Sequence, residues 1–138
     1  MLDFLHALVA FLAANNVLPA EVTPDDTNRE KTYLQNLPDT PAKVCCVRLY
    51  DTSLPTLVGK QAGVHRVQVL MRNSNHTEVL NDIYKLWQFL INRPELIEDI
   101  SPDFWVIFDV QSGPIPAGRD EKGNYLYSLN IPIKTKMY

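Results

Sequence analysis

The sequence contains few of the residues that catalytic and metal-binding sites require. Its 138 residues include two cysteines, Cys45 and Cys46, and three histidines, His6, His65 and His76. The cysteines are adjacent, so in a strand they point to opposite faces and an ordinary disulfide is not expected. No two histidines have the spacing by which a helix binds a metal. We expect a non-enzyme without cofactor or metal. A cysteine nucleophile with His65 as its base stays open as a minor alternative.

The sequence also lacks an excess of positive charge. It has 13 Lys and Arg against 16 Asp and Glu, which gives a net charge of −3. A protein that binds nucleic acid generally is usually basic, so this balance argues against that function but leaves room for a local basic patch. There is no glycine-rich loop with the Lys-Ser/Thr signature of a phosphate site.

A long uninterrupted hydrophobic run is missing as well. Residues 2–22 are rich in apolar side chains, but Asp3, Asn15, Asn16 and Pro19 interrupt them. A membrane-spanning helix needs about 20 mostly apolar residues, so we expect no membrane association. The first residues include no basic region and no small-residue cleavage site, so we expect no signal peptide. Hydrophobic residues nevertheless make up 46% of the chain, enough for one packed domain spanning residues 1–138.

The most informative stretch is a predicted strand followed by a predicted helix. Residues 64–72 alternate, with Val67 and Val69 on one face and Arg66 and Gln68 on the other. This period of two predicts a half-buried strand.

The period then changes to that of an amphipathic helix. Apolar residues recur at helical spacing from Val79 to Ile91. Asn75 and Glu78 have the spacing of a capping box, and Pro94 ends the helix. We expect the Trp87 side of this helix to lie on a sheet. The residues expected to be buried together are Val47, Val67, Val69, Leu80, Ile83 and Trp87.

The remaining elements complete the predicted fold. We expect a helix at residues 2–15 and strands at 31–37, 43–51, 104–110 and 125–134. The order α-β-β-β-α-β-β predicts the α+β class, with two main helices and a mainly antiparallel mixed sheet. Because Pro132 lies within the last strand, we expect that strand at an edge.

Two regions are candidate interaction sites. Residues 111–124 are long for a hairpin connection and rich in glycine and proline, so we expect a loop that contacts another chain and is mobile in the isolated protein. Its candidate contact residues are Pro114, Pro116, Arg119, Asp120, Glu121, Lys122 and Asn124. Separately, Arg48, Arg66 and Arg72 fall on polar strand faces and could form a positive surface toward phosphate or an acidic partner. An ordinary solvated sheet face is the alternative.

Four short motifs carry a resemblance to a known family. They are V-R-L-Y-D at 47–51, V-Q-V-L-M-R at 67–72, P-x-x-x-G-x-D-x-x-G at 114–123 and Y-S-L-N at 127–130. With the order of elements, they make the chain resemble the minor capsid or tail terminator (tail completion) proteins of long-tailed bacteriophages.

The resemblance implies a structural virion protein rather than an enzyme. Such proteins cap the head-proximal end of the tail tube as a ring, typically of six subunits, end tube growth and offer a surface to the head. The implied partners are further copies of the chain, the tail tube protein and a head completion or connector protein, with passing DNA contact in the channel. Assembly would take place in the bacterial host cytoplasm. Two alternatives stay open: another head–tail connector or neck component, and a cytoplasmic α+β module that binds a small ligand or a peptide along its last strand.

Overall fold

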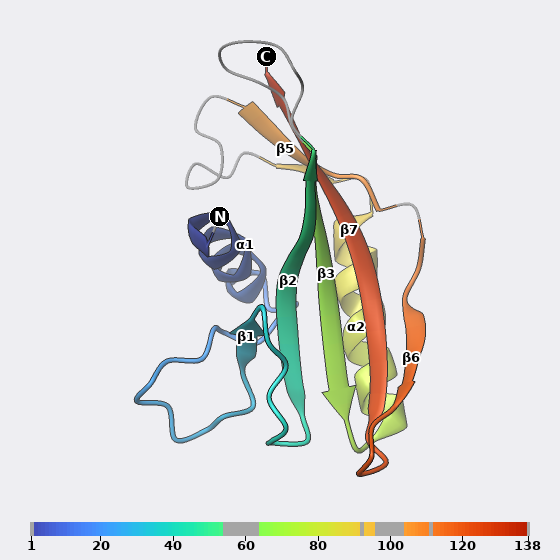
Figure 1. Ribbon diagram of the computed structural model, residues 1–138. Coiled ribbons are helices and arrows are strands. Elements are labelled where there is room, and N and C mark those ends of the chain that lie inside the picture. The colour runs from blue at the N-terminus through green and yellow to red at the C-terminus, as the bar shows by residue number, and fades with distance from the viewer. Residues whose placement is uncertain (1, 54–63, 92, 96–103, 111, 138) are drawn as a thin grey trace.

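The computed structural model describes residues 2–53, 64–91, 93–95, 104–110 and 112–137, and shows two helices beside one large sheet (Figure 1). Most of residues 52–62, where Pro55 and Gly59 predict a loop, lie outside these ranges, as do the acidic residues Glu98, Asp99 and Asp103. The elements in chain order are α1 (Leu2–Ala14), β1 (Thr32–Leu34), β2 (Val44–Ser53), β3 (Val64–Asn73), α2 (His76–Leu90), β4 (Arg93–Glu95), β5 (Phe104–Phe108), β6 (Ile115–Arg119) and β7 (Tyr125–Met137). The α+β class and the predicted order are confirmed, with β4 and β6 as additional short strands.

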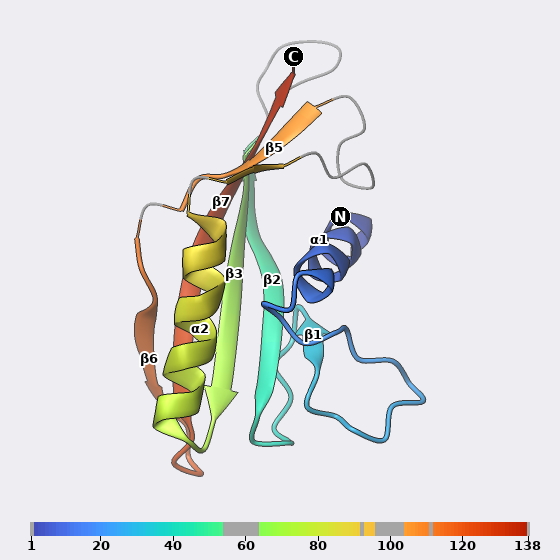
Figure 2. The same ribbon diagram turned by 180° about the vertical axis from the view of Figure 1, so that it is seen from behind.

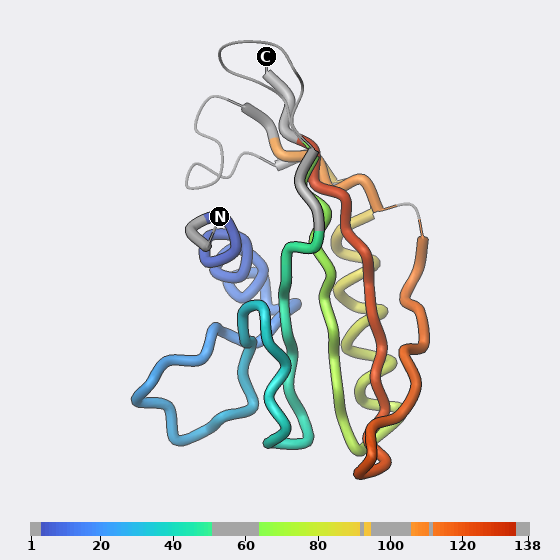
Figure 3. The backbone as a smooth tube through the Cα atoms, viewed as in Figure 1, coloured from blue at the N-terminus to red at the C-terminus, as the bar shows by residue number. Residues whose placement is uncertain are grey.

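The sheet is organised around three long strands that run side by side, β2, β3 and β7, as the tube view shows (Figure 3). The strand order is β1-β2-β3-β7-β5-β4, with β6 also paired to β7. Among the strand pairs formed by the described residues, β1–β2 is parallel and the other pairs are antiparallel. The mainly antiparallel sheet predicted from the sequence is therefore confirmed.

The expectation that β7 is an edge strand is wrong. β3 pairs with β7 on one side, while β6 and β5 pair with different parts of β7 on the other. Pro132 lies between the residues paired with β6 and those paired with β5, and its carbonyl oxygen accepts a hydrogen bond from the Asp109 N–H at 2.8 Å. The Pro132 nitrogen faces the same side of β7 as this carbonyl oxygen. The N–H donor that proline lacks is therefore missing in the gap between the part of β7 paired with β6 and the part paired with β5. A peptide therefore cannot add as a further strand where β7 is already paired on both sides.

Both helices pack on the same face of the sheet, as Figure 2 shows from behind. A single apolar cluster joins Leu5 and Leu8 of α1, Ile83 and Leu86 of α2, and the inward side chains of the strands, including Val69. These side chains are fully buried. The core therefore lies in one layer between the two helices and the sheet.

The predicted N-cap of α2 is confirmed, but the buried face of the helix is displaced from the predicted one. The Asn75 side chain accepts a hydrogen bond from the Glu78 N–H at 3.1 Å. The Glu78 carboxylate pairs with Lys43 rather than returning to the cap. The buried residues of α2 are Val79, Ile83, Leu86 and Leu90. Of the six residues predicted to be buried together, Leu80 and Trp87 are only half-buried, because they lie about 60° to 120° around the helix from Leu90 and Leu86.

The region expected to be an irregular loop contains a strand. β6 pairs with β7 through Ile115 with Ser128, Pro116 with Tyr127 and Arg119 with Tyr125, and the register shifts between Pro116 and Arg119. All five β6 residues are exposed. Sequence reasoning missed this strand because proline and glycine rarely occur in strand interiors. At an edge with a bulge, however, both residues are tolerated.

Candidate functional site

The face of the sheet opposite the helices carries a row of polar side chains. Arg48, Gln68 and Asn130 occupy paired positions on β2, β3 and β7. The Arg48 Nε donates to Gln68 Oε1 at 2.7 Å, and Gln68 Nε2 donates to Asn130 Oδ1 at 3.4 Å. We call this surface the helix-free face. The three side chains of this row therefore form hydrogen bonds with one another.

The three arginines predicted on this face have different environments. Arg48 is exposed and Arg66 is half-buried, which agrees with a polar surface. Arg72 is buried, so its assignment to a solvated face is wrong. Its guanidinium donates to the carbonyl oxygens of Pro41 and Ala42, at 2.7 and 3.2 Å. The sequence holds no signal for this contact, because it arises where a distant proline-rich segment folds over β3.

The tip of the β6–β7 hairpin is ordered by its own hydrogen bonds. Asp120 Oδ1 accepts from the N–H groups of Lys122 and Asn124, and its Oδ2 accepts from the Asn124 side chain at 2.9 Å. Arg119 donates to the Gly123 carbonyl oxygen and lies over the Tyr125 ring. These contacts hold the pKa of Asp120 below its usual value, with the Asn124 side chain as the largest cause.

The residues predicted in this hairpin therefore divide into two groups. Arg119, Asp120 and Asn124 hold the turn together, whereas Glu121 and Lys122 are exposed at its tip. On the arm, Pro116 is exposed and Pro114 is half-buried. The hairpin thus presents a pre-ordered charged tip, in place of the irregular loop expected from composition.

An apolar stripe runs along the side of α2 where the Trp87 ring lies beside Gly113, just before β6, and sequence reasoning did not single it out as a surface. It consists of Leu80, Tyr84, Trp87 and Ile91, and we call it the α2 flank. Tyr84 is 41% exposed and Ile91 is 42% exposed. The Tyr84 ring meets Trp87 edge-on, with 5.6 Å between ring centroids. Leu80, Trp87 and Ile91 belong to the apolar repeat from which the sequence predicts a core-facing stripe, whereas Tyr84 carries no such prediction.

An aromatic cluster adjoins the α2 flank at the start of the helix. His76 Nε2 lies 2.6 Å from the Tyr127 hydroxyl. The His76 ring stacks on Tyr125, with 4.6 Å between centroids. This contact ties the first turn of α2 to the start of β7, beside the hairpin.

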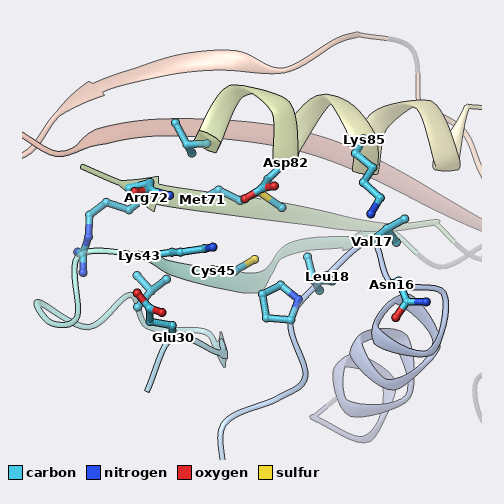
Figure 4. A pocket seen from close by; sticks show the side chains of 14 residues that line it. Asn16, Val17, Leu18, Glu30, Lys43, Cys45, Met71, Arg72, Asp82 and Lys85 are labelled. Atoms are coloured by element: carbon cyan, nitrogen blue, oxygen red, sulfur yellow. The ribbon is translucent and has the colours of Figure 1, made fainter. Parts of the chain in front are cut away.

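A pocket of about 310 Å³ opens between α2 and the segment that follows α1 (Figure 4). Lys43 and Lys85 extend into it from opposite sides, with Asp82 between them in the view. Burial raises the pKa of Asp82. The Asn73 side-chain nitrogen at this pocket is buried and has no hydrogen-bond partner among the described residues. Because positive and negative side chains alternate around the rim, the pocket does not select strongly for one charge.

The proposed pairing of a cysteine nucleophile with His65 is not assembled. Cys45 pairs with Met71 on β3, six residues from His65, which corresponds to roughly 20 Å along the strand. Burial raises the pKa of both thiols, that of Cys46 to about 11. Neutral thiols are poor nucleophiles, so neither cysteine is activated.

The described residues also contain no group of three or more His, Cys, Asp or Glu side chains placed to hold a metal ion. Within the same ranges, neither helix has the length and apolar character needed to cross a membrane.

Comparison with known families decides the class of protein. The model of a bacteriophage tail terminator protein family matches residues 11–136, which is most of the chain. The chain belongs to this family. No curated protein matches it. Membership of a tail terminator family identifies a structural component of the phage tail, and hence of the virion, and it confirms the resemblance seen in the sequence motifs.

The family match covers the surfaces described above. It includes β2, β3 and β7, which form the helix-free face, together with the hairpin and the α2 flank.

Proposed function

We propose that this chain caps the head-proximal end of the phage tail tube as a ring, ends tube elongation and provides the surface to which the head joins. The observation that carries the proposal is the tail terminator family match over residues 11–136. The partners are further copies of the chain, typically six in a ring, the tail tube protein and a head completion or connector protein.

In this proposal, the helix-free face lines the channel that DNA crosses. Its central row consists of Arg48 and two neutral amides, Gln68 and Asn130. Tight, salt-sensitive binding of DNA needs many cationic contacts. A wall with few arginines among neutral amides permits passing contact with DNA without holding it.

The β6–β7 hairpin is the proposed contact with the tail tube. Asp120 and Asn124 hold the turn, so little conformational entropy is lost when the tip binds. Glu121 and Lys122 are exposed at the tip, and Pro116 is exposed on the arm. A partner surface with charges complementary to the tip would fix the register of the contact.

The decisive experiment is tail assembly with and without this protein, with tube length measured by electron microscopy. Without it, we expect tubes of uncontrolled length that do not join heads. Addition of the purified wild-type protein should stop elongation and restore joining. Tubes of normal length that fail only in joining would identify a neck component instead. Normal joined tails without the protein would contradict both functions.

A matched pair of variants tests the role of the hairpin. Exchange of the tip charges, by Glu121→Lys with Lys122→Glu, leaves the turn-forming Asp120 in place and should abolish capping. The control exchanges two neighbouring charges in the segment before β1, by Glu30→Lys with Lys31→Glu, and likewise leaves the net charge unchanged. Equal capping by both double variants would remove the hairpin from the tube contact.

A further inference from the structure

The outer face of α1 carries few polar residues for a surface helix, although the exposed His6 on it pairs with Glu21. From Phe4 to Ala14, His6 is the only polar residue. One side of the helix is buried in the core, including Leu8 and Leu12, while Ala10 and Ala14 are exposed. A helix that is apolar all round is normally buried on all sides. The outer face of α1 is therefore suited to being covered by another apolar surface.

The α2 flank is a second apolar surface, and its exposed side chains are large where those of α1 are small. Tyr84 and Ile91 each leave about two fifths of their surface exposed, and Trp87 lies half-buried between them. Tyrosine and tryptophan are the residues most enriched among those that dominate binding energy at protein interfaces. Large side chains protrude from this flank, whereas the outer face of α1 carries alanines that leave room for them.

The two surfaces lie on opposite sides of the subunit. Figures 1 and 2 show α1 at one side of the long strands and β6, which is nearer the α2 flank, at the other. A contact between two different surfaces on opposite sides of a subunit repeats from copy to copy, and it closes into a ring when the rotation permits.

We propose that the α2 flank of one subunit packs against the outer face of α1 in a second copy of this chain. The proposal rests on the proposed ring and identifies the surfaces that form it. The exposed residues of the contact, Ala10, Ala14, Tyr84 and Ile91, are uncharged, and His6, one turn before Ala10, is already paired with Glu21. Burial of the contact therefore leaves no unpaired charge there, which favours a mutual apolar partner over an acidic or basic one.

Two single substitutions test the contact from its two sides. Ala10→Glu and Tyr84→Glu each place a charge within it, and both positions are exposed in the subunit, so the fold should be retained. We expect each to weaken self-association by roughly a hundredfold, since an unpaired charge is costly to bury. Asn81→Glu is the control, because Asn81 is exposed on α2 outside the flank. Native mass spectrometry and light scattering measure association, alone and with tail tubes, and urea unfolding verifies folding.

Cross-linking tests the pairing directly. A subunit with Ala10→Cys mixed with a subunit carrying Tyr84→Cys should give a mixed dimer with a short bismaleimide linker. Ala10→Cys alone should give none, because the two faces of the contact differ. The native Cys45 and Cys46 are buried and should not contribute. Equal yields of like and mixed dimers would overturn the pairing.

The outcomes separate this inference from the proposed function. If the wild type assembles a ring and both glutamate variants assemble it equally well, the surface assignment is wrong while the capping function stands. If the wild type stays monomeric both alone and on tail tubes, the ring and the inference fail together. Loss of assembly in both variants, retained assembly in Asn81→Glu and formation of the mixed dimer support the inference.

Discussion

Arg72 on β3 donates a hydrogen bond of 2.7 Å from Nη2 to the carbonyl oxygen of Pro41, in the segment that precedes β2. The same guanidinium donates from Nε to the Ala42 carbonyl oxygen and lies 3.8 Å from the Asp120 carboxylate. One buried side chain therefore joins three parts of the chain: the centre of the sheet, the segment before β2 and the hairpin tip.

We expect Arg72→Met to lower the free energy of unfolding by about 2–4 kcal/mol, because it leaves two carbonyl oxygens without donors and removes a charge partner of Asp120. Urea unfolding measures the loss. Arg48→Met is the matched control, since Arg48 is exposed, and it should cost under about 1 kcal/mol. Equal decreases in the free energy of unfolding in the two variants would show that the contacts of Arg72 do not stabilise the fold.

We expect Leu86→Ala to destabilise the protein by about 2–5 kcal/mol, because Leu86 is fully buried between α2 and the sheet. Trp87→Ala should cost about 1–2 kcal/mol, since part of that ring already contacts water. Urea unfolding of the two variants compares them under identical conditions. A larger loss of stability in Trp87→Ala than in Leu86→Ala would show that the helix face predicted from the sequence is the buried one.

Acid should weaken the hairpin. The pKa of Asp120 is lowered in the folded state by hydrogen bonds from Asn124 and Lys122 and by the nearby Arg72. A lowered folded-state pKa stabilises the protein above the unfolded value of about 3.9, and this stabilisation is lost as the pH falls below it. Asp82, whose pKa is raised by burial, acts in the opposite direction. The urea midpoint measured from pH 6 to pH 3 should fall less steeply for Asp120→Asn than for the wild type. An identical dependence of the urea midpoint on pH in the two proteins would contradict the role of the Asp120 carboxylate in stabilising the hairpin.

The native thiols should be inert. Burial raises the pKa of Cys45 and Cys46, that of Cys46 to about 11, so little thiolate is present at pH 8. Ellman's reagent should react with neither thiol in the folded protein and with both in urea. Ala14→Cys, at an exposed position, supplies the fast-reacting control. A rapidly reacting native thiol would reopen the question of a cysteine nucleophile.

The turn at the hairpin tip requires glycine. Gly123 has φ of 81°, and a Cβ there would lie 3.3 Å from the Arg119 guanidinium. We expect Gly123→Ala to cost about 1–2 kcal/mol from backbone strain. Gly113→Ala is the control, because its added Cβ meets the Trp87 ring at an ordinary 3.7 Å. Thermal unfolding compares the variants, and equal midpoints would show that the turn relaxes without cost.

The long elements could be predicted from the sequence because each carries a strong local signal. The alternation from Val64 to Arg72 predicted β3, and the Asn75 cap with its following apolar repeat predicted α2. The class of protein could also be inferred, since the motifs that suggested a tail terminator lie within the part of the chain that matches the family.

Only the tertiary structure decided which surfaces are exposed. The β-strand period assigned Arg72 to a polar face, but a segment 30 residues earlier covers it. Pro132 indicated an edge, yet its nitrogen lies where two partner strands of β7 meet. Likewise, helical spacing cannot distinguish Leu86, in the core, from Trp87 beside it, because both lie on one apolar stripe about 100° apart. Periodicity reports only which side chains share a face. What covers that face depends on contacts between residues far apart in the chain.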